Sequence, residues 1–430
     1  MKNNNKIKKQ WNRYRMLWST QAFSALGSGM TSYALVLWLY LRTGSALGTA
    51  LLSVCSYAPY VIMSMFAGAL SDRWDKKRTI LICDCIAALC TVLVFVLVKT
   101  DMLCVWHLYA LNALNGLMNT IQQPAGEVAA TRLLPKTFYH KASGLNSLSQ
   151  SLNTILTPVL ATALFAFGGI DVVIGFDLLT FVLAYLTLWL FIPIPGGRET
   201  EEKKESLLAS VRTGLAWLAH NSLILKLMLF LACINLVASV YDVSLPALIL
   251  SKQNGGETIL GTVNTCVGMA TLAGSMIVTF LPAPKNRVRV ICLSLLVSMC
   301  TENFMLAFGK TPVIWCVGAV FGWLCIPIMN ASMNVIFRSE IPVSMQGRIY
   351  SCRNTLQFFT IPVGFLLGGV LIDRVFEPFM AKQPPAGLLA SLFGYGKGGG
   401  AAMLLFVFGI LGVLICLIFS WMLRKYDWRE

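Results

Sequence analysis

The sequence predicts an all-α integral membrane protein with twelve transmembrane helices in two pseudo-symmetric six-helix bundles. Of its 430 residues, 57% are hydrophobic and only 12% are charged, whereas a soluble chain averages about 25% charged residues. The apolar residues gather in windows that can supply the roughly 20 residues needed to cross a bilayer as a helix. Twelve such windows occupy more than half of the chain. No soluble domain of ordinary size remains to be placed, so the function must lie in the membrane.

Twelve apolar windows define the predicted helices in chain order. Nine of them contain no Asp, Glu, Lys or Arg: residues 16–41, 43–71, 102–126, 142–170, 178–197, 258–284, 311–337, 354–372 and 398–423. The other three contain a single acid: 79–98 with Asp84, 227–251 with Asp242 and 290–309 with Glu302. Each window can supply one crossing, so we expect one helix per window.

The distribution of positive charge predicts the orientation of the chain. The net charge of +15 comes from 34 Lys and Arg against 19 Asp and Glu. With the N-terminus in the cytoplasm, 26 of the cations fall in cytoplasmic segments and seven in outer segments, in agreement with the positive-inside rule. We therefore predict that both termini are cytoplasmic and that window 16–41 is a retained first helix. The charge then indicates contact with a lipid bilayer and no binding of nucleic acid.

A hydrophilic segment at 193–206 divides the spans into six and six. We predict an N-terminal six-helix bundle over 1–193, a cytoplasmic linker with an amphipathic helix over 194–224, and a C-terminal six-helix bundle over 225–430. Two such halves are typical of secondary transporters. Neither a phosphate-binding loop nor metal spacing among the 13 Cys and three His can be found. We therefore expect no cofactor and no metal, with an ion gradient as the driving force.

Polar side chains recur at helical spacing in several spans. Because a polar group that faces lipid costs energy, such a stripe marks the face that meets water or another helix. The stripes comprise Gln21, Ser24, Ser28 and Thr31; Asn112, Asn115, Asn119 and Gln122; Asn235, Ser239 and Asp242; and Asn330 and Asn334. We interpret them as the lining of a shared aqueous cavity, with hydrogen bonding between helices as the alternative. The predicted substrate-binding residues are Gln21, Ser28, Asn112, Asn115, Asn119, Asn235, Asp242 and Asn330.

Acidic side chains at membrane depth are candidates for ion coupling. Asp242 shares a face with the polar stripe of its span, and Glu302 lies at similar depth, so we predict both as proton-coupling residues. Asp84 lies just over one turn from the basic cluster 76–78, which favours a structural ion pair. Asp177 lies one and a half turns from the outer end of its span, where we expect it to reach the membrane interface.

The segment 68–78 reads GALSDRWDKKR. It resembles the signature loop of the major facilitator superfamily, Gly-x-Leu-x-Asp-Arg-x-Gly-Arg-Lys. The resemblance implies the twelve-helix major facilitator fold. It also implies a latch in which the acid at the Asp72 position caps the eleventh helix and pairs with the arginine. The predicted gating residues are Gly68, Asp72, Arg73, Lys77 and Arg353.

Further blocks along the chain are similar to one branch of that family, the macrolide-efflux-type and siderophore exporters. They include residues 21–28, 123–125, 347–351 and 353–358. The resemblance implies a secondary active exporter of amphipathic small molecules, macrolide-like or multidrug, in a bacterial cytoplasmic membrane. Proton-coupled antiport by alternating access is the implied mechanism. The expected partners are a small-molecule substrate and protons, and the expected state is a monomer.

Other functions stay open at this point. Within transport, the alternative is export of a siderophore or peptide-like metabolite. From another class, the chain could be a polytopic membrane enzyme or a channel. An enzyme would need a cluster of charged catalytic groups at one interface, and a channel would more often be a symmetric oligomer of shorter subunits without a latch loop. The sequence shows neither pattern, so we predict a transporter and not an enzyme.

Overall fold

The computed structural model describes residues 2–134, 138–194, 207–280, 284–342 and 346–426. All regular structure within these ranges is helical. Ten described helical segments are long and apolar enough to cross a membrane. One of these, Leu148–Phe191, covers most of two predicted spans, 142–170 and 178–197. The prediction of an all-helical membrane protein is therefore confirmed. By its internal contacts, the chain forms two compact units.

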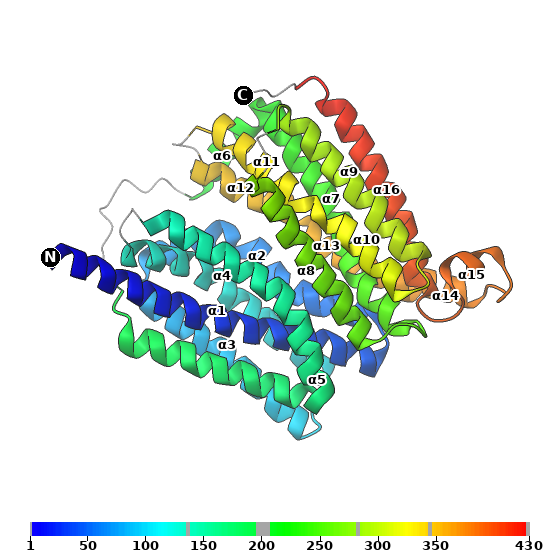
Figure 1. Cartoon of the computed structure of the whole chain (residues 1–430), viewed down its shortest axis with the longest axis horizontal. Helices are drawn as coiled ribbons and strands as arrows, with labels where there is room; N and C mark the ends of the chain where they lie inside the picture. The colour runs from blue at the N-terminus through cyan, green and yellow to red at the C-terminus, as the bar shows by residue number, and fades with distance from the viewer. Residues whose placement is uncertain (1, 135–137, 195–206, 281–283, 343–345, 427–430) are drawn as a thin grey trace. The chain divides into compact units, whose positions relative to one another are not determined.

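The first unit comprises residues 1–38 and 55–204. Its helices are α1 (Lys2–Thr43), α2 (Ala46–Arg73), α3 (Lys76–Lys99), α4 (Val105–Leu133) and α5 (Tyr139–Phe191). The 53 residues of α5 cover most of the fifth and sixth predicted spans. The two spans are separated at Gly168 and Gly169, whose backbone departs from helical geometry. Gly169 has φ 68°, a left-handed value that favours glycine, and the chain doubles back there (Figure 1).

Short polar side chains begin three of the helices. Asp75 caps α3 by accepting a hydrogen bond from the backbone N–H of Arg78 at 2.9 Å. Asn221 and Asn286 cap α7 (Ser222–Ser251) and α9 (Arg287–Phe308) in the same way. Such a cap satisfies one of the N–H groups that the first turn of a helix leaves without a partner.

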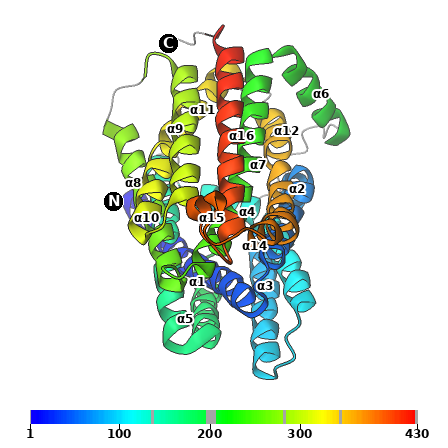
Figure 2. The ribbon, with the colours of Figure 1, turned by 90° about the vertical axis from the view of Figure 1, so that its right-hand side faces the viewer.

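The second unit comprises residues 39–54 and 205–430. Besides α7 and α9, its helices are α6 (Leu207–His220), α8 (Glu257–Phe280), α10 (Pro312–Leu324), α11 (Ile326–Glu340), α12 (Gln346–Phe358), α13 (Thr360–Val370), η3 (Leu371–Phe376), α14 (Glu377–Ala381), α15 (Leu388–Phe393) and α16 (Gly399–Leu423). The tenth predicted span is broken at Cys325, between α10 and α11. The eleventh is a succession of short helices that includes the π-helix η3. Figure 2 shows α16 between α7 and α9, against both of which it packs.

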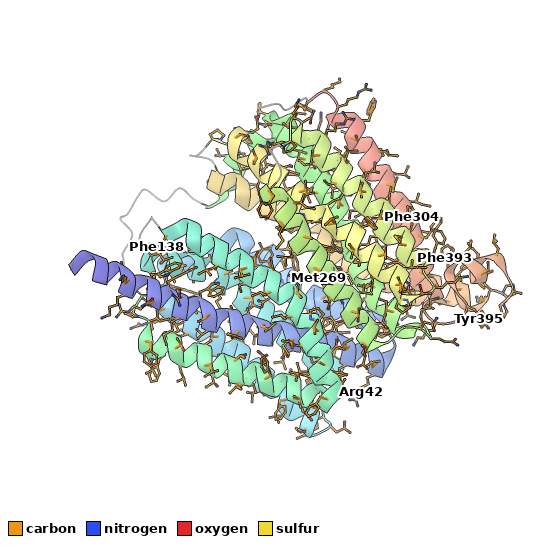
Figure 3. The ribbon with its side chains drawn as sticks, viewed as in Figure 1. Arg42, Phe138, Met269, Phe304, Phe393 and Tyr395 are labelled. Atoms are coloured by element: carbon orange, nitrogen blue, oxygen red, sulfur yellow. The ribbon has the colours of Figure 1, made fainter. Side chains whose placement is uncertain are left out.

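An aromatic cluster joins three elements of the second unit. The ring of Phe393 in α15 lies 5.6 Å from that of Phe308 and 5.5 Å from that of Phe406. Phe304 of α9 also contacts Phe406, with 5.7 Å between ring centroids. Figure 3 labels Phe304 and Phe393 among the side chains on this side of the unit. The cluster anchors the short helix α15 to α9 and α16.

Two helices begin in one unit and end in the other. The boundary crosses α1 between Trp38 and Leu39, and it crosses α2 between Val54 and Cys55. The end of α1 and the beginning of α2 therefore belong, by their contacts, to the second unit. Only the remainder of each helix packs in the first unit.

Candidate functional site

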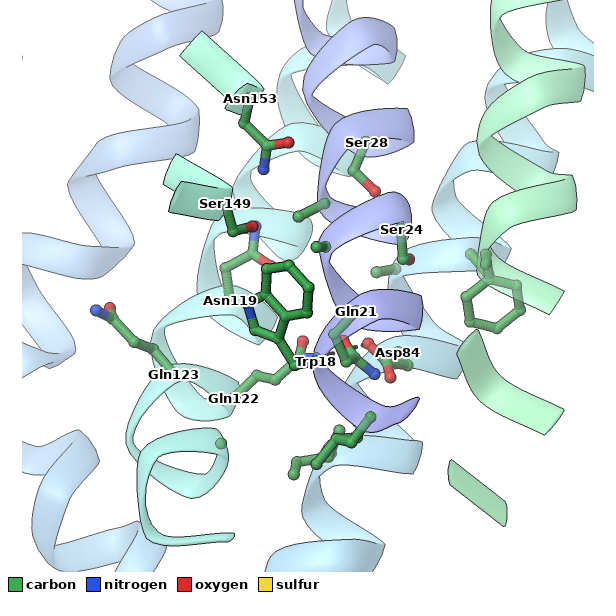
Figure 4. Close-up of a pocket in the computed structure, with 18 of the residues that line it drawn as sticks. Trp18, Gln21, Ser24, Ser28, Asp84, Asn119, Gln122, Gln123, Ser149 and Asn153 are labelled. Carbon is green, nitrogen blue, oxygen red and sulfur yellow. Dashed lines mark hydrogen bonds between the residues drawn. The ribbon is translucent and has the colours of Figure 1, made fainter. Parts of the chain in front are cut away.

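A polar cavity lies inside the first unit, among α1, α3, α4 and α5 (Figure 4). Its volume is about 580 Å³. We call it the amide cavity, because eight of its lining residues carry amides: Gln21, Asn115, Asn119, Gln122, Gln123, Asn146, Gln150 and Asn153. Its other polar lining residues include Ser24, Ser28, Asp84, Thr91, Ser149 and Asp177. The predicted stripes of the first and fourth spans thus line the same space, together with Asn146, Ser149, Gln150 and Asn153 of α5.

Asp84 projects from α3 into the amide cavity. Its Oδ1 accepts a hydrogen bond of 2.6 Å from Nε2 of Gln122, and Gln21 lies beside the same carboxylate (Figure 4). The expected ion pair with the 76–78 cluster is wrong. A helix rises 1.5 Å per residue, which separates Asp84 from that cluster by roughly 9–12 Å along α3. Lys77 of the cluster instead donates to the backbone oxygen of Trp189 at 3.0 Å.

Asp177 is the second carboxylate of the amide cavity. Only 4% of its surface is exposed, and Oγ of Ser28 donates to its Oδ1 at 3.0 Å. The expectation that Asp177 reaches the membrane interface is wrong. It lies eight residues past the reversal at Gly169, about 12 Å along the helix, where Gly27 of α1 lets the two helices come into close contact.

The charge of the amide cavity is unbalanced. Among the described residues that line it, two are Asp and none is Lys, Arg or His. A carboxylate at membrane depth is costly unless a proton, a cation or several hydrogen-bond donors stabilise it. The cavity can therefore accommodate protons or the cationic group of a ligand, while its amides offer hydrogen bonds to polar atoms of many geometries.

A second cavity, of about 350 Å³, lies inside the second unit. We call it the Glu302 cavity; its polar lining residues are Asn235, Tyr241, Ser298, Glu302, Asn303, Trp323, Asn330, Asn334, Arg353 and Gln357. Glu302 is 4% exposed and accepts a hydrogen bond of 2.6 Å from Nε1 of Trp323. Gly322 gives it room, since a Cβ at that position would lie 2.6 Å from Cβ of Glu302. The guanidinium carbon of Arg353 lies 5.6 Å from the ring centroid of Phe337, so this cavity holds both signs of charge.

Asp242 lines neither of these cavities. Its side chain is exposed on α7, while its predicted stripe partners are engaged elsewhere. Asn235 donates to the backbone oxygen of Gln357 at 3.0 Å, and Ser239 is buried and donates to the backbone oxygen of Asn235 at 2.7 Å. An exposed carboxylate within a membrane-spanning helix requires contact with water.

The structure distributes the other predicted binding residues between the two units. Gln21, Ser28, Asn115 and Asn119 line the amide cavity. Asn112 lines an adjoining pocket of about 30 Å³. Asn235 and Asn330 line the Glu302 cavity.

The structure describes the side chains of two of the predicted gating residues, Lys77 and Arg353. Gly68, Asp72 and Arg73 lie near the end of α2, where side-chain surroundings are outside the described part of the chain. Lys77 donates to the backbone oxygen of Trp189, and Arg353 lines the Glu302 cavity.

The sequence contains a signal for the position of Asp84 in the amide cavity. Thr91, seven residues further along α3, also lines the amide cavity, and that spacing places both residues on one helix face.

Comparison with known proteins identifies the family. The family model described as Major Facilitator Superfamily matches residues 17–365. The chain belongs to the Major Facilitator Superfamily. It is thus a multi-pass membrane transporter, and not an enzyme. The latch-loop resemblance and the twelve-helix expectation agree with this assignment.

Several curated members of the superfamily are similar to this transporter. It is 22% identical to macrolide efflux protein A of Streptococcus pyogenes over 84% of this chain and 90% of that protein. It is 25% identical to the multidrug efflux pump Tap of Mycolicibacterium fortuitum, with the same coverage of 84% and 90%. Enterobactin exporter EntS of Citrobacter koseri is 24% identical over 78% of this chain and 79% of that protein.

The fold is also found among solved structures of transporters. The bacterial homolog of the human lysosomal transporter Spinster, in an inward-facing and occupied conformation, matches with a TM-score of 0.70. The match covers 97% of this chain and 98% of the other at 15% sequence identity. At this identity the likeness supports the fold alone.

Proposed function

We propose that this transporter exports amphipathic small molecules, macrolide-like or multidrug, from the cytoplasm of a bacterium by proton-coupled antiport. The observation that carries the proposal is the amide cavity. Its volume of about 580 Å³ lies within the range of pockets that bind drug-sized ligands. Its mixture of apolar walls, amides and two carboxylates suits an amphipathic molecule with a basic group. The similarity of the chain to macrolide and multidrug efflux proteins also supports the proposal.

Competition for a carboxylate supplies a simple coupling mechanism. A buried carboxylate is stabilised by a proton or by a substrate cation, and either one displaces the other. Asp84 and Asp177, which both line the amide cavity, are the carboxylates that we propose for this exchange. Glu302 and Asp242 are the predicted proton-coupling residues of the second unit. Release of substrate on one side of the membrane and of protons on the other would then be linked through alternating access.

Export of a siderophore or peptide-like metabolite is the second candidate. The similarity to the enterobactin exporter favours it. So does Arg353, whose side chain lines the Glu302 cavity and would attract an acidic substrate. A basic substrate would instead be repelled from that part of the site.

The charge asymmetry completes the proposal. With 26 cations in the proposed cytoplasmic segments and seven in the outer ones, both termini face the cytoplasm of a bacterial cell. We propose that the transporter works as a monomer, without a cofactor.

Transport by the purified full chain in liposomes tests the proposal. A radiolabelled macrolide should accumulate when a pH gradient is imposed and should leak out when an uncoupler collapses it. Transport that an uncoupler leaves unchanged would contradict proton coupling. Movement of a catecholate siderophore without movement of the macrolide would favour the second candidate.

Asp242→Asn tests the role of the exposed carboxylate on α7. The substitution keeps the shape of the side chain and removes its charge, so we expect gradient-driven transport to be abolished while substrate binding largely remains. Asp171→Asn is the matched control, because Asp171 forms an exposed ion pair of 2.6 Å with Lys99 and such pairs contribute little. Equal transport by both variants would remove Asp242 from the mechanism.

A further inference from the structure

The beginning of α2 is held by a carboxylate from a distant part of the chain. Oδ2 of Asp373, in η3, accepts hydrogen bonds from Oγ of Ser45 at 2.6 Å and from the backbone N–H of Leu47 at 2.9 Å. Its Oδ1 accepts one from the backbone N–H of Ala46 at 3.0 Å. Asp373 is more than 320 residues from these groups in the sequence, so the contact joins the second span to the eleventh.

Asp373 completes a helix terminus that the local sequence satisfies only in part. The first four N–H groups of a helix lack intrahelical partners. Ser45 caps the N–H of Gly48 with its own hydroxyl at 3.0 Å. Asp373 takes the two preceding N–H groups, and its negative charge lies at the positive end of the α2 dipole. The helix end would have exposed donors without this residue.

Close packing surrounds this contact. A Cβ at Gly369 of α13 would lie 2.7 Å from Cβ of Ala50 and 2.8 Å from Cα of Leu47, so α13 and the start of α2 are in direct contact. On α1, the hydroxyl of Tyr40 donates to the backbone oxygen of Ala247 at 3.1 Å and lies 2.7 Å from Oγ of Ser251. These contacts explain why residues 39–54 group with the second unit.

We propose that Asp373 is a gating residue that locks the outer side of the transporter. It holds the start of α2 on the second unit, while the rest of α2 belongs to the first unit. Opening toward the outside requires α2 to move with the first unit, so Ser45 and the first N–H groups of α2 must leave Asp373. The proposal deepens the proposed alternating-access mechanism and rests on the same orientation of the chain.

The position of η3 favours this role. A π-helix carries one more residue per hydrogen-bonded turn than an α-helix, and such segments are frequent at functional sites. Here the six residues from Leu371 to Phe376 present Asp373 to α2. Four residues later Glu377 caps a different helix: it accepts from the backbone N–H groups of Gly398 and Ala401 at the start of α16. Asp373 and Glu377 thus both cap the N-terminus of a helix, but of the two only Asp373 binds α2.

Cysteine accessibility tests the lock. Thr49 is 4% exposed and lies one turn into α2, so Thr49→Cys places a nearly isosteric reporter behind the contact. We expect a membrane-impermeant maleimide, added to intact cells, to label this reporter slowly. With Asp373→Ala the labelling rate should rise roughly fivefold to thirtyfold, the change that loss of a charged helix cap makes in an equilibrium constant. The same variants without the reporter give the background from the 13 native cysteines.

Glu377→Ala is the matched control, because it removes a helix cap from the same segment without touching α2. Its labelling rate should equal that of the parent. If Asp373→Ala does not fold, as judged by size-exclusion chromatography, Ser45→Ala removes part of the same contact and should raise labelling severalfold. Unchanged labelling in whichever of these variants folds, or an equal rise with Glu377→Ala, would overturn the proposal.

The outcomes separate the lock from the proposed function. Increased labelling in a protein that moves no tested drug would support the lock and contradict drug export. Drug transport by the parent, together with a labelling rate that Asp373→Ala leaves unchanged, would support export and contradict the lock.

Discussion

Three acidic residues within the spans are stabilised by different kinds of partner, and the partner indicates what each acid can do. Asp373 binds backbone N–H groups at a helix end. Glu302 binds an indole N–H, and Asp84 binds an amide. A neutral donor leaves the charge of the carboxylate uncompensated, whereas a helix N-terminus partly offsets it. Asp84 and Glu302 are thus better suited to exchanging protons or cations, and Asp373 to holding structure.

Asp84→Asn should separate substrates by their charge. The amide keeps an oxygen that can accept from Gln122 but loses the charge. Transport of a cationic drug should therefore fall about tenfold or more, since a hydrogen bond to a charged group contributes roughly 1.5–3 kcal/mol. Transport of a neutral drug of similar size should change little. Initial rates in proteoliposomes measure both, and an equal loss for the two drugs would contradict a charge-specific role.

The positions of these acids could be read from the sequence, but their partners could not. Periodicity places a residue on a helix face, and it was enough to group Asn115 and Asn119 with Gln122. It does not tell which helix that face meets. Asp84 and Gln122 are 38 residues apart, on helices whose pairing only the fold determines.

At the scale of helices, breaks in regular geometry follow local sequence signals that the apolar windows conceal. The break between α10 and α11 falls at Cys325, two residues before Pro327 in the first turn of α11, where proline lacks the N–H that would continue the hydrogen bonding of the preceding helix. The reversal within α5 falls at a Gly168-Gly169 pair. Hydropathy averages over such positions, so it predicts the spans but not where they bend.

Close approach of α4 and α2 requires a glycine. A Cβ at Gly116 would collide with the backbone oxygen of Ser56, whereas a Cβ at Gly126, on the same helix, would meet nothing within 4 Å. Gly116→Ala should destabilise the protein by about 1–3 kcal/mol, the usual cost of overpacking. Gly126→Ala should be neutral or slightly stabilising, because alanine favours the helix. Thermal unfolding of both variants in detergent checks this, and equal midpoints would contradict the packing argument.

For the whole molecule, chain order and spatial grouping differ. The sequence divides the spans at the 194–224 linker, of which residues 195–206 lie outside the described ranges. Contacts also assign residues 39–54 to the second unit. Nothing in composition distinguishes that hairpin from its neighbours, because the groups that hold it, such as Asp373, come from the other end of the sequence.

Epitope tags test the orientation that the charges predict. A tag inserted between Lys382 and Pro384 should bind antibody in intact spheroplasts, because that connection is predicted to lie outside. A tag after Glu430 should bind antibody only after permeabilisation, because the C-terminal segment is rich in cations and predicted to be cytoplasmic. The reverse pattern would overturn the topology, and with it the assignment of Asp373 to the outer side.

The shared helix α2 also has the mechanical properties of a lever. Pro59 lies within it and lacks the N–H that would bond the carbonyl of Cys55, the residue at which α2 passes into the first unit. From Pro59 to Ala46 the helix is about 20 Å long. A tilt of about ten degrees at this pivot would move its tip by about 3.5 Å, which is enough to break every hydrogen bond to Asp373. A small bend of α2 at Pro59 would therefore release its first residues from Asp373 abruptly.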